Sequence, residues 1–164
     1  MAATLRVWLQ RLFPVTSADN SSSGTGPSPA SNPTSIAYPY EYDGNGVPSG
    51  HVLLDVQEAN GQFTTIDFEV DTGDYVPTMP ASACEALGYV LTQGQESTLA
   101  GVDGQPFTVY THQINVRLHG QTGMIQIPIA FSTLQTPLLA GWFGFLQHFN
   151  RFTFDNVAKA LIFQ

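Results

Sequence analysis

The segment FEVDTGDYVPTMP, residues 68–80, ends an alternating apolar and polar run on Asp71-Thr72-Gly73, and a second acid, Asp74, follows directly. A strand that runs into Asp-Thr-Gly can leave the carboxylate on a sharp turn, because Gly73 allows backbone angles and close approaches that a β-carbon would forbid. Two such carboxylates within hydrogen-bonding distance cannot both ionise, so the pair holds one proton. One member then acts as a base toward a water molecule while the other donates to a carbonyl.

The chain contains only one Asp-Thr-Gly, so a carboxylate pair requires a second chain to supply the other aspartate. The tripeptide by itself is weak evidence, because Asp, Thr and Gly are ordinary turn formers. The surrounding elements therefore decide whether this turn predicts chemistry or only a turn.

Short segments with period-two alternation, punctuated by Gly, Pro and Asn, follow from residue 36 onward and predict strands. A connection ending in Asn60-Gly61 predicts a hairpin between the first two, and Pro128 fits best at an edge or bulge. One helix is predicted over residues 80–89, with Pro80 or Ser82 at its start and Gly88 in its C-terminal cap. The predicted strands cover residues 51–56, 63–70, 112–118, 123–131, 151–155 and 159–163.

The first 35 residues differ in composition from the rest. A short apolar stretch with Arg6 and Arg11 is followed by a Ser-, Gly-, Pro- and Asn-rich segment, which predicts a disordered or weakly helical tail over residues 1–35 and one domain over 36–164. The domain carries twelve acids against three bases, so nucleic acid is excluded as a partner on charge grounds, and a membrane partner is not expected.

The single cysteine, Cys84, cannot form an internal disulfide, and the four histidines show no metal-ligand spacing. No cofactor and no metal ion are predicted. The lone cysteine and the absence of a clear signal peptide favour a cytoplasmic location.

The order of motifs resembles that of the retropepsin-like aspartic proteases, single-domain homodimeric relatives of the retroviral proteases, and most closely their cellular and bacterial members. The resemblance covers residues 38–163. It includes FEVDTG, then a strand, proline and short helix at 75–89, then a hairpin and return strand at 97–118, and last LLAGWFGFLQHFNRFTFD. It implies an all-β fold, the closed β-barrel of an acid-protease half with one or two short helices.

The resemblance also implies an aspartic endopeptidase whose active site forms between two subunits of a homodimer. Asp71 would be the catalytic aspartate, Thr72 would hydrogen-bond across the dimer axis, and Gly73 would let the substrate backbone lie close. Asp74 would lie beside the bound peptide. The flap that closes over the peptide would consist of Gly101, Val102, Asp103 and Gly104, and the apolar floor behind the aspartates of Leu139, Ala140 and Gly141.

Two positions depart from the family pattern. Asp74 stands where a small Ala or Ser is usual, and this extra carboxylate predicts an aspartate pair that titrates higher than usual. Trp142 stands where an arginine commonly follows the second-signature glycine, and Tyr75 stands where retroviral members carry its acidic partner. An aromatic contact is therefore expected in place of an ion pair.

Two other hypotheses about function and fold remain open from the sequence alone. The same fold and dimer could grip an extended peptide by strand addition without cleaving it, and Asp74 and Trp142 are the features that favour this reading. Alternatively, Asp71-Thr72-Gly73 is a plain turn in an unrelated β-sandwich, which predicts a monomer.

Overall fold

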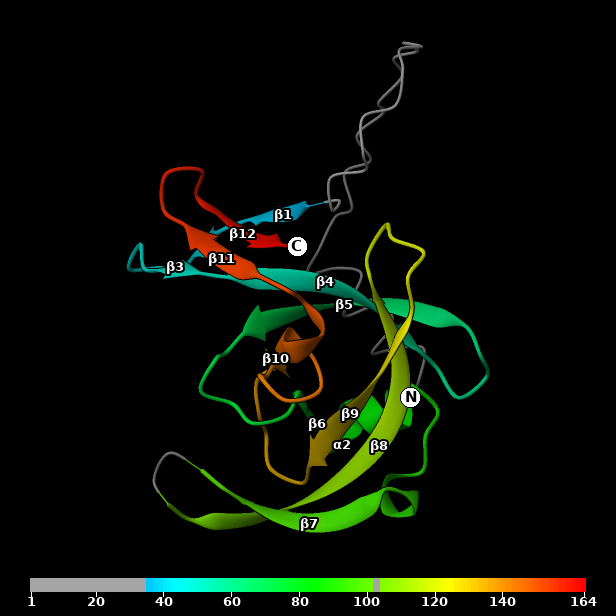
Figure 1. Cartoon of the computed structure of the whole chain (residues 1–164). Coiled ribbons are helices and arrows are strands. Elements are labelled where there is room, and N and C mark those ends of the chain that lie inside the picture. Colours follow the sequence, from blue (N-terminus) through cyan, green and yellow to red (C-terminus); the bar gives the residue numbers. More distant parts are fainter. Residues whose placement is uncertain (1–34, 102–103) are drawn as a thin grey trace.

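The computed structural model describes residues 35–101 and 104–164. The predicted tail over residues 1–35 therefore lies, apart from Ser35, outside the described residues. The strands are β1 Ile36–Pro39, β2 Glu41–Tyr42, β3 Pro48–Ser49, β4 His51–Gln57, β5 Phe63–Val70, β6 Thr78–Pro80, β7 Gln95–Ala100, β8 Pro106–Leu118, β9 Ile125–Ser132, β10 Leu139–Ala140, β11 Phe152–Asp155 and β12 Ala160–Phe163, with helix α2 Ala81–Ala86 and the 3-10 helices η1 Leu91–Gln93 and η2 Leu146–His148 (Figure 1).

The predicted hairpin of residues 51–56 and 63–70 is confirmed as β4 and β5. These strands pair antiparallel with Val52 opposite Phe68 and Leu54 opposite Ile66. All four side chains are buried, so one face of the hairpin forms core. The alternate residues face outward and carry the polar groups, as the period of two requires.

Seven strands form one sheet in the order β4-β5-β10-β6-β9-β8-β7, and β4 also pairs with the end of β8. This additional pairing joins the two ends of the series β4-β5-β10-β6-β9-β8 into a closed ring. The core inside it is apolar, with Phe68, Phe131 and Ile127 at 0% exposure. The predicted all-β barrel with a short helix is confirmed.

The long strand β8 pairs with β9 along its middle and with two further strands at its ends. Its first half pairs with β7 as an extended hairpin, and its last three residues pair with β4. Figure 1 shows the β7–β8 hairpin reaching away from the ring at one end. The ring therefore carries a projecting two-stranded arm on the sheet that contains the Asp-Thr-Gly turn.

The C-terminal strands form a separate three-stranded sheet in the order β1-β12-β11. The two strands predicted over residues 151–155 and 159–163 are confirmed as β11 and β12. Tyr38 of β1 and Phe163 of β12 meet edge to face at 6.0 Å between ring centroids, and Phe149 packs on Phe163 at 4.7 Å. These aromatic contacts join the small sheet to the main core.

The predicted helix over residues 80–89 is confirmed in shortened form as α2. Pro80 occupies its N-terminal cap position in extended conformation, and Gly88 ends it with φ of +80°. Cys84 points into the core and is fully buried.

Pro128 lies within β9, opposite Gln113 of β8, whereas the pairing of β9 with β6 begins only at Ala130. The proline therefore lies where one side of β9 has no strand neighbour, as expected.

Asp55, on the outer face of β4, links three strands. Its carboxylate accepts from Arg117 Nε at 3.0 Å and Thr65 Oγ1 at 2.7 Å, and lies 2.7 Å from His119 Nδ1. Burial alone would raise the pKa of Asp55, but the hydrogen bonds from His119, Thr65 and Arg117 hold this pKa below its ordinary value. The ionised form is thus stabilised in the folded chain.

No helix in the described residues is both long and apolar enough to cross a bilayer.

We expect Asp55→Asn to lower the free energy of unfolding at pH 7 by about 2 kcal/mol, because the hydrogen bonds to a charged acceptor are weakened. A depressed folded-state pKa contributes stability above the ordinary value of 3.8, and this contribution is lost as the pH falls through the folded-state value. Urea unfolding from pH 7 down to pH 2 should show the two proteins converging in acid. Glu85→Gln, on the exposed side of α2, serves as the control; a constant difference at every pH would contradict the electrostatic account.

Candidate active site

The Asp71 carboxylate is oriented by its own turn. The strand β5 ends at Val70, and Asp71 follows on the turn with its side chain half-buried. The backbone N–H of Gly73 donates to Asp71 Oδ1 at 2.7 Å, and the N–H of Asp74 donates to the Asp71 carbonyl at 3.3 Å. Thr72 and Gly73 are exposed. The turn therefore holds one carboxylate in a defined orientation at the surface of the chain.

The strand β10 lies directly beside this turn. It runs parallel to the end of β5, with Ala140 opposite Val70, and antiparallel to β6, with Leu139 opposite Thr78. The backbone N–H of Asp71 donates to the carbonyl of Ala140 at 3.2 Å. Two segments separated by nearly seventy residues in the sequence are thereby joined. The structure brings the predicted floor residues against the predicted catalytic turn.

Gly141 is buried where two backbone segments cross. A β-carbon at this position would lie 2.7 Å from the carbonyl carbon of Val76 and 2.8 Å from the carbonyl oxygen of Asp74. Both neighbours are backbone atoms, which cannot rotate away. Next to the crossing, Trp142 N–H donates to the Asp74 carbonyl at 2.9 Å and Phe143 N–H donates to the Tyr75 carbonyl at 2.7 Å. The absence of a side chain at 141 permits this two-bond connection.

The Asp74 carboxyl is half-buried and lies 2.8 Å from the hydroxyl of Thr78, which is itself buried and 3.0 Å from the Val76 carbonyl. Burial raises the pKa of Asp74, the hydrogen bond from Thr78 opposes this, and the charge of Asp71 raises it further. Because a hydroxyl has one proton, protonated Asp74 can donate to Thr78 while Thr78 donates to Val76. The structure therefore commits this carboxyl to a contact within its own chain. Thr78 carries no signal in the sequence that links it to Asp74.

The aromatic residues around the turn pair differently from the sequence-based expectation. Tyr75 stacks on Phe143, with ring centroids 5.1 Å apart and an angle of 5° between the planes. Trp142 instead meets Phe152 of β11 edge to face at 5.9 Å. Tyr75 does make the expected aromatic contact, but its partner is Phe143 and not Trp142. Tyr75 remains 64% exposed and Trp142 51% exposed, so both rings offer surface beside the turn.

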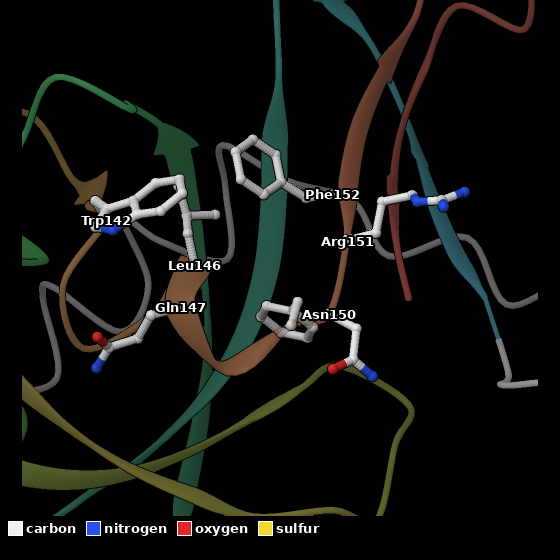
Figure 2. A pocket seen from close by; sticks show the side chains of 7 residues that line it. Trp142, Leu146, Gln147, Asn150, Arg151 and Phe152 are labelled. Atoms are coloured by element: carbon white, nitrogen blue, oxygen red, sulfur yellow. The ribbon is translucent and has the colours of Figure 1, made fainter.

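A hollow of about 470 Å³ lies beside Trp142. Trp142, Leu146 and Phe152 lie next to one another along this hollow, with the two rings edge to face, whereas the Arg151 guanidinium points away (Figure 2). None of the residues of the Asp-Thr-Gly turn lines this hollow, which is formed by Trp142, Leu146, Gln147, Phe149, Asn150, Arg151 and Phe152.

The end of the β7–β8 hairpin is described only in part. Gly101 N–H donates to the Gln105 carbonyl at 3.0 Å, and Gly104 N–H donates to the Gly101 carbonyl at 2.9 Å. Gly104 has φ of +75°, a conformation that favours glycine. Val102 and Asp103, the other two predicted flap residues, lie outside the described residues.

Cys84 and His112 come close in space, 3.9 Å between Sγ and Nε2. The cysteine is fully buried, and burial raises the pKa of its thiol to about 11, followed by a smaller effect of Glu85. His112 Nε2 also lies 3.1 Å from the Leu91 carbonyl, where its N–H can donate. A buried thiol held protonated is not a nucleophile. Cys84 therefore acts as a small buried apolar residue of the core.

Gly141→Ala is expected to lower the free energy of unfolding by about 3 kcal/mol or more, because the new methyl group would collide with two backbone carbonyls. Gly123→Ala is the matched control, since a β-carbon there meets nothing within 4 Å and the residue does not need a positive φ. Chemical denaturation of both variants gives the comparison. Equal small effects would show that the crossing can relax.

Asp74→Asn is expected to raise the melting temperature at pH 7 by a few degrees and to leave it unchanged near pH 3. A folded-state pKa above the ordinary 3.8 means that the contribution of Asp74 is fully present below 3.8 and is lost as the pH rises through the folded-state value. The asparagine keeps a partner for Thr78 without the charge. An equal gain at both pH values would point to side-chain shape rather than ionisation.

Comparison with known proteins supports the architecture. No family model and no curated protein matches the sequence. Among solved structures, a retropepsin-like aspartic protease from Rickettsia conorii is similar, with 20% identity and a TM-score of 0.56, over 80% of this chain and 99% of that chain. The strand ring with its short helix is thus a fold of the retropepsin-like kind.

Proposed function

We propose that this chain is one subunit of a homodimeric aspartic endopeptidase. The observation that carries the proposal is the Asp71 turn, where Gly73 orients the carboxylate and Ala140 anchors the backbone, within a fold similar to that of a retropepsin-like aspartic protease. A single subunit presents one such carboxylate, and general acid–base hydrolysis by carboxylates alone uses two. A second copy related by two-fold symmetry supplies the other.

In the proposed reaction the two Asp71 carboxyls share one proton. The ionised member removes a proton from a water molecule, which attacks the peptide carbonyl carbon, while the protonated member donates its proton to the carbonyl oxygen. The resulting tetrahedral diol collapses when its C–N bond breaks and the amine nitrogen takes up a proton. The products are a carboxylic acid and an amine, and neither a cofactor nor a covalent intermediate is involved.

The remaining predicted residues take supporting roles in this proposal. Thr72 hydrogen-bonds across the dimer axis, and exposed Gly73 allows the substrate backbone to lie against the turn. The β7–β8 hairpin forms the flap, because it projects from the ring and ends in Gly101 and Gly104. An extended peptide then lies between flap and floor and adds backbone hydrogen bonds as a strand does.

A second candidate function is a dimer that grips extended peptides without hydrolysing them. The observation that favours it is Asp74, whose half-buried carboxyl lies beside Asp71 and has a raised pKa. Dimerisation would bring four carboxyls close together, and their mutual repulsion near neutral pH works against a correctly protonated pair. In this reading the groove retains its shape, and turnover is lost.

Cleavage of a mixed peptide library, followed by mass spectrometry from pH 4 to pH 7, tests the proposal together with sedimentation of the same samples. We expect a dimer whose cleavage rate increases toward acid, because the reaction needs one proton on the pair. Asp71→Asn should lower the rate by at least about a hundredfold while the dimer persists.

Glu85→Gln serves as the control for loss of one exposed carboxylate elsewhere. A dimer that binds peptides but never cleaves them would favour the second function. A chain that stays monomeric over the whole pH range and shows no cleavage would contradict both.

A further inference from the structure

Three side chains from three strands meet on the outer face of the β4–β5 hairpin, outside the Asp-Thr-Gly turn. Glu41 of β2, His51 of β4 and Asp67 of β5 each bring one ligand atom to within 4.8 Å of the other two. His51 Nδ1 lies 3.1 Å from Asp67 Oδ1. Glu41 is exposed, and the other two residues are half-buried. A nitrogen and two carboxylate oxygens thus converge on one point.

The Asp67 carboxylate has fewer positively charged partners than the Asp55 carboxylate on the same face of the hairpin. Its side chain is only 7% exposed, and within the described residues its one ion-pair partner is His51. Asp55, on the same face of the hairpin and 9% exposed, has both Arg117 and His119. The imidazole of His51 can supply one positive charge at most, whereas Glu41 and Asp67 carry two negative charges, so the cluster keeps a negative charge that a divalent cation would balance.

We propose that Glu41, His51 and Asp67 bind a divalent transition-metal ion of the zinc type. Imidazole nitrogen and carboxylate oxygen are donors that zinc accepts, and three protein ligands leave a position for water. Metal–ligand bonds of about 2.1 Å in a tetrahedral site set the ligand atoms roughly 3.4 Å apart. The exposed Glu41 side chain can close the remaining gap by rotation, and the two carboxylates balance the charge of the ion.

A further acid, Glu69, lies next to the cluster but is not one of the three converging residues. Glu69 lies opposite His51 in the β4–β5 register, but its Oε1 accepts a hydrogen bond from Ser49 Oγ at 2.8 Å. Glu69 therefore adds negative potential to the site while Glu41 and Asp67 supply the oxygen ligands.

A bound ion would connect parts of the chain that backbone pairing leaves separate. The strands β2 and β3 form a two-stranded sheet of their own, whereas β4 and β5 belong to the seven-stranded sheet. The ion would cross-link these two sheets. Its ligand Asp67 lies on β5, four residues before Asp71. This inference does not depend on the proposed peptidase activity.

Titration of the purified full-length chain with Co²⁺ at fixed pH tests the site, because Co²⁺ reports its coordination through visible absorption and Zn²⁺ should displace it. We expect one equivalent to bind and to raise the melting temperature. His51→Gln and Asp67→Asn should each weaken binding by at least about tenfold. Glu41→Gln should also weaken it, and because Glu41 is exposed, this variant does not risk the fold.

His119→Gln is the matched control, since it removes an imidazole that also pairs with a buried aspartate on the same hairpin face, where Arg117 already balances the charge. The proposal predicts unchanged Co²⁺ binding in this variant. It would be overturned if the wild-type chain bound no Co²⁺, or if Glu41→Gln and His51→Gln bound it as tightly as the wild type. It would equally be overturned if His119→Gln caused the main loss.

Discussion

The geometry of the candidate site depends on one close approach of backbone to backbone, at Gly141. The segment that follows β10 passes within van der Waals contact of residues 74–76 and donates two hydrogen bonds to their carbonyls. This crossing holds β10 between β5 and β6, and β10 in turn accepts the Asp71 N–H. The backbone position of Asp71 therefore depends on Gly141, a residue without a side chain, while the Gly73 N–H orients the carboxylate itself.

Next to this crossing the chain places two stacked aromatic rings. Tyr75 and Phe143 are stacked, and the same two residues are joined by the hydrogen bond from the Phe143 N–H to the Tyr75 carbonyl, so the ring contact adds to the backbone connection. Stacked rings avoid the desolvation cost of a buried ion pair but leave apolar surface exposed. The exposed rings of Tyr75 and Trp142 form apolar surface beside the Asp71 turn, where the proposed second subunit or peptide would lie.

Three aspartates of this chain have the same carboxyl group but lie in three different environments. Asp55 is neutralised by a guanidinium and an imidazole, so its ionised form is favoured. Asp74 is half-buried and lies near the charge of Asp71, and these two effects outweigh its hydrogen bonds with Thr78 and the Tyr75 N–H, so its protonated form is favoured. Asp67 is buried with an imidazole as its ion-pair partner and an exposed glutamate close by, which is an arrangement suited to a cation.

The sequence by itself determined the class of fold, because period-two alternation, the Asn-Gly hairpin and the Gly88 cap act over a few residues, and β4, β5, α2, β11 and β12 agree with the prediction. It also drew attention to Asp71 and to the glycine at 141. Only the tertiary structure decided that Thr78 is the partner of Asp74, that Tyr75 pairs with Phe143, and that Glu41, His51 and Asp67 converge. These contacts depend on strand register and on the side-chain rotamers that packing in the core allows. Neither can be inferred from the spacing of residues along the sequence.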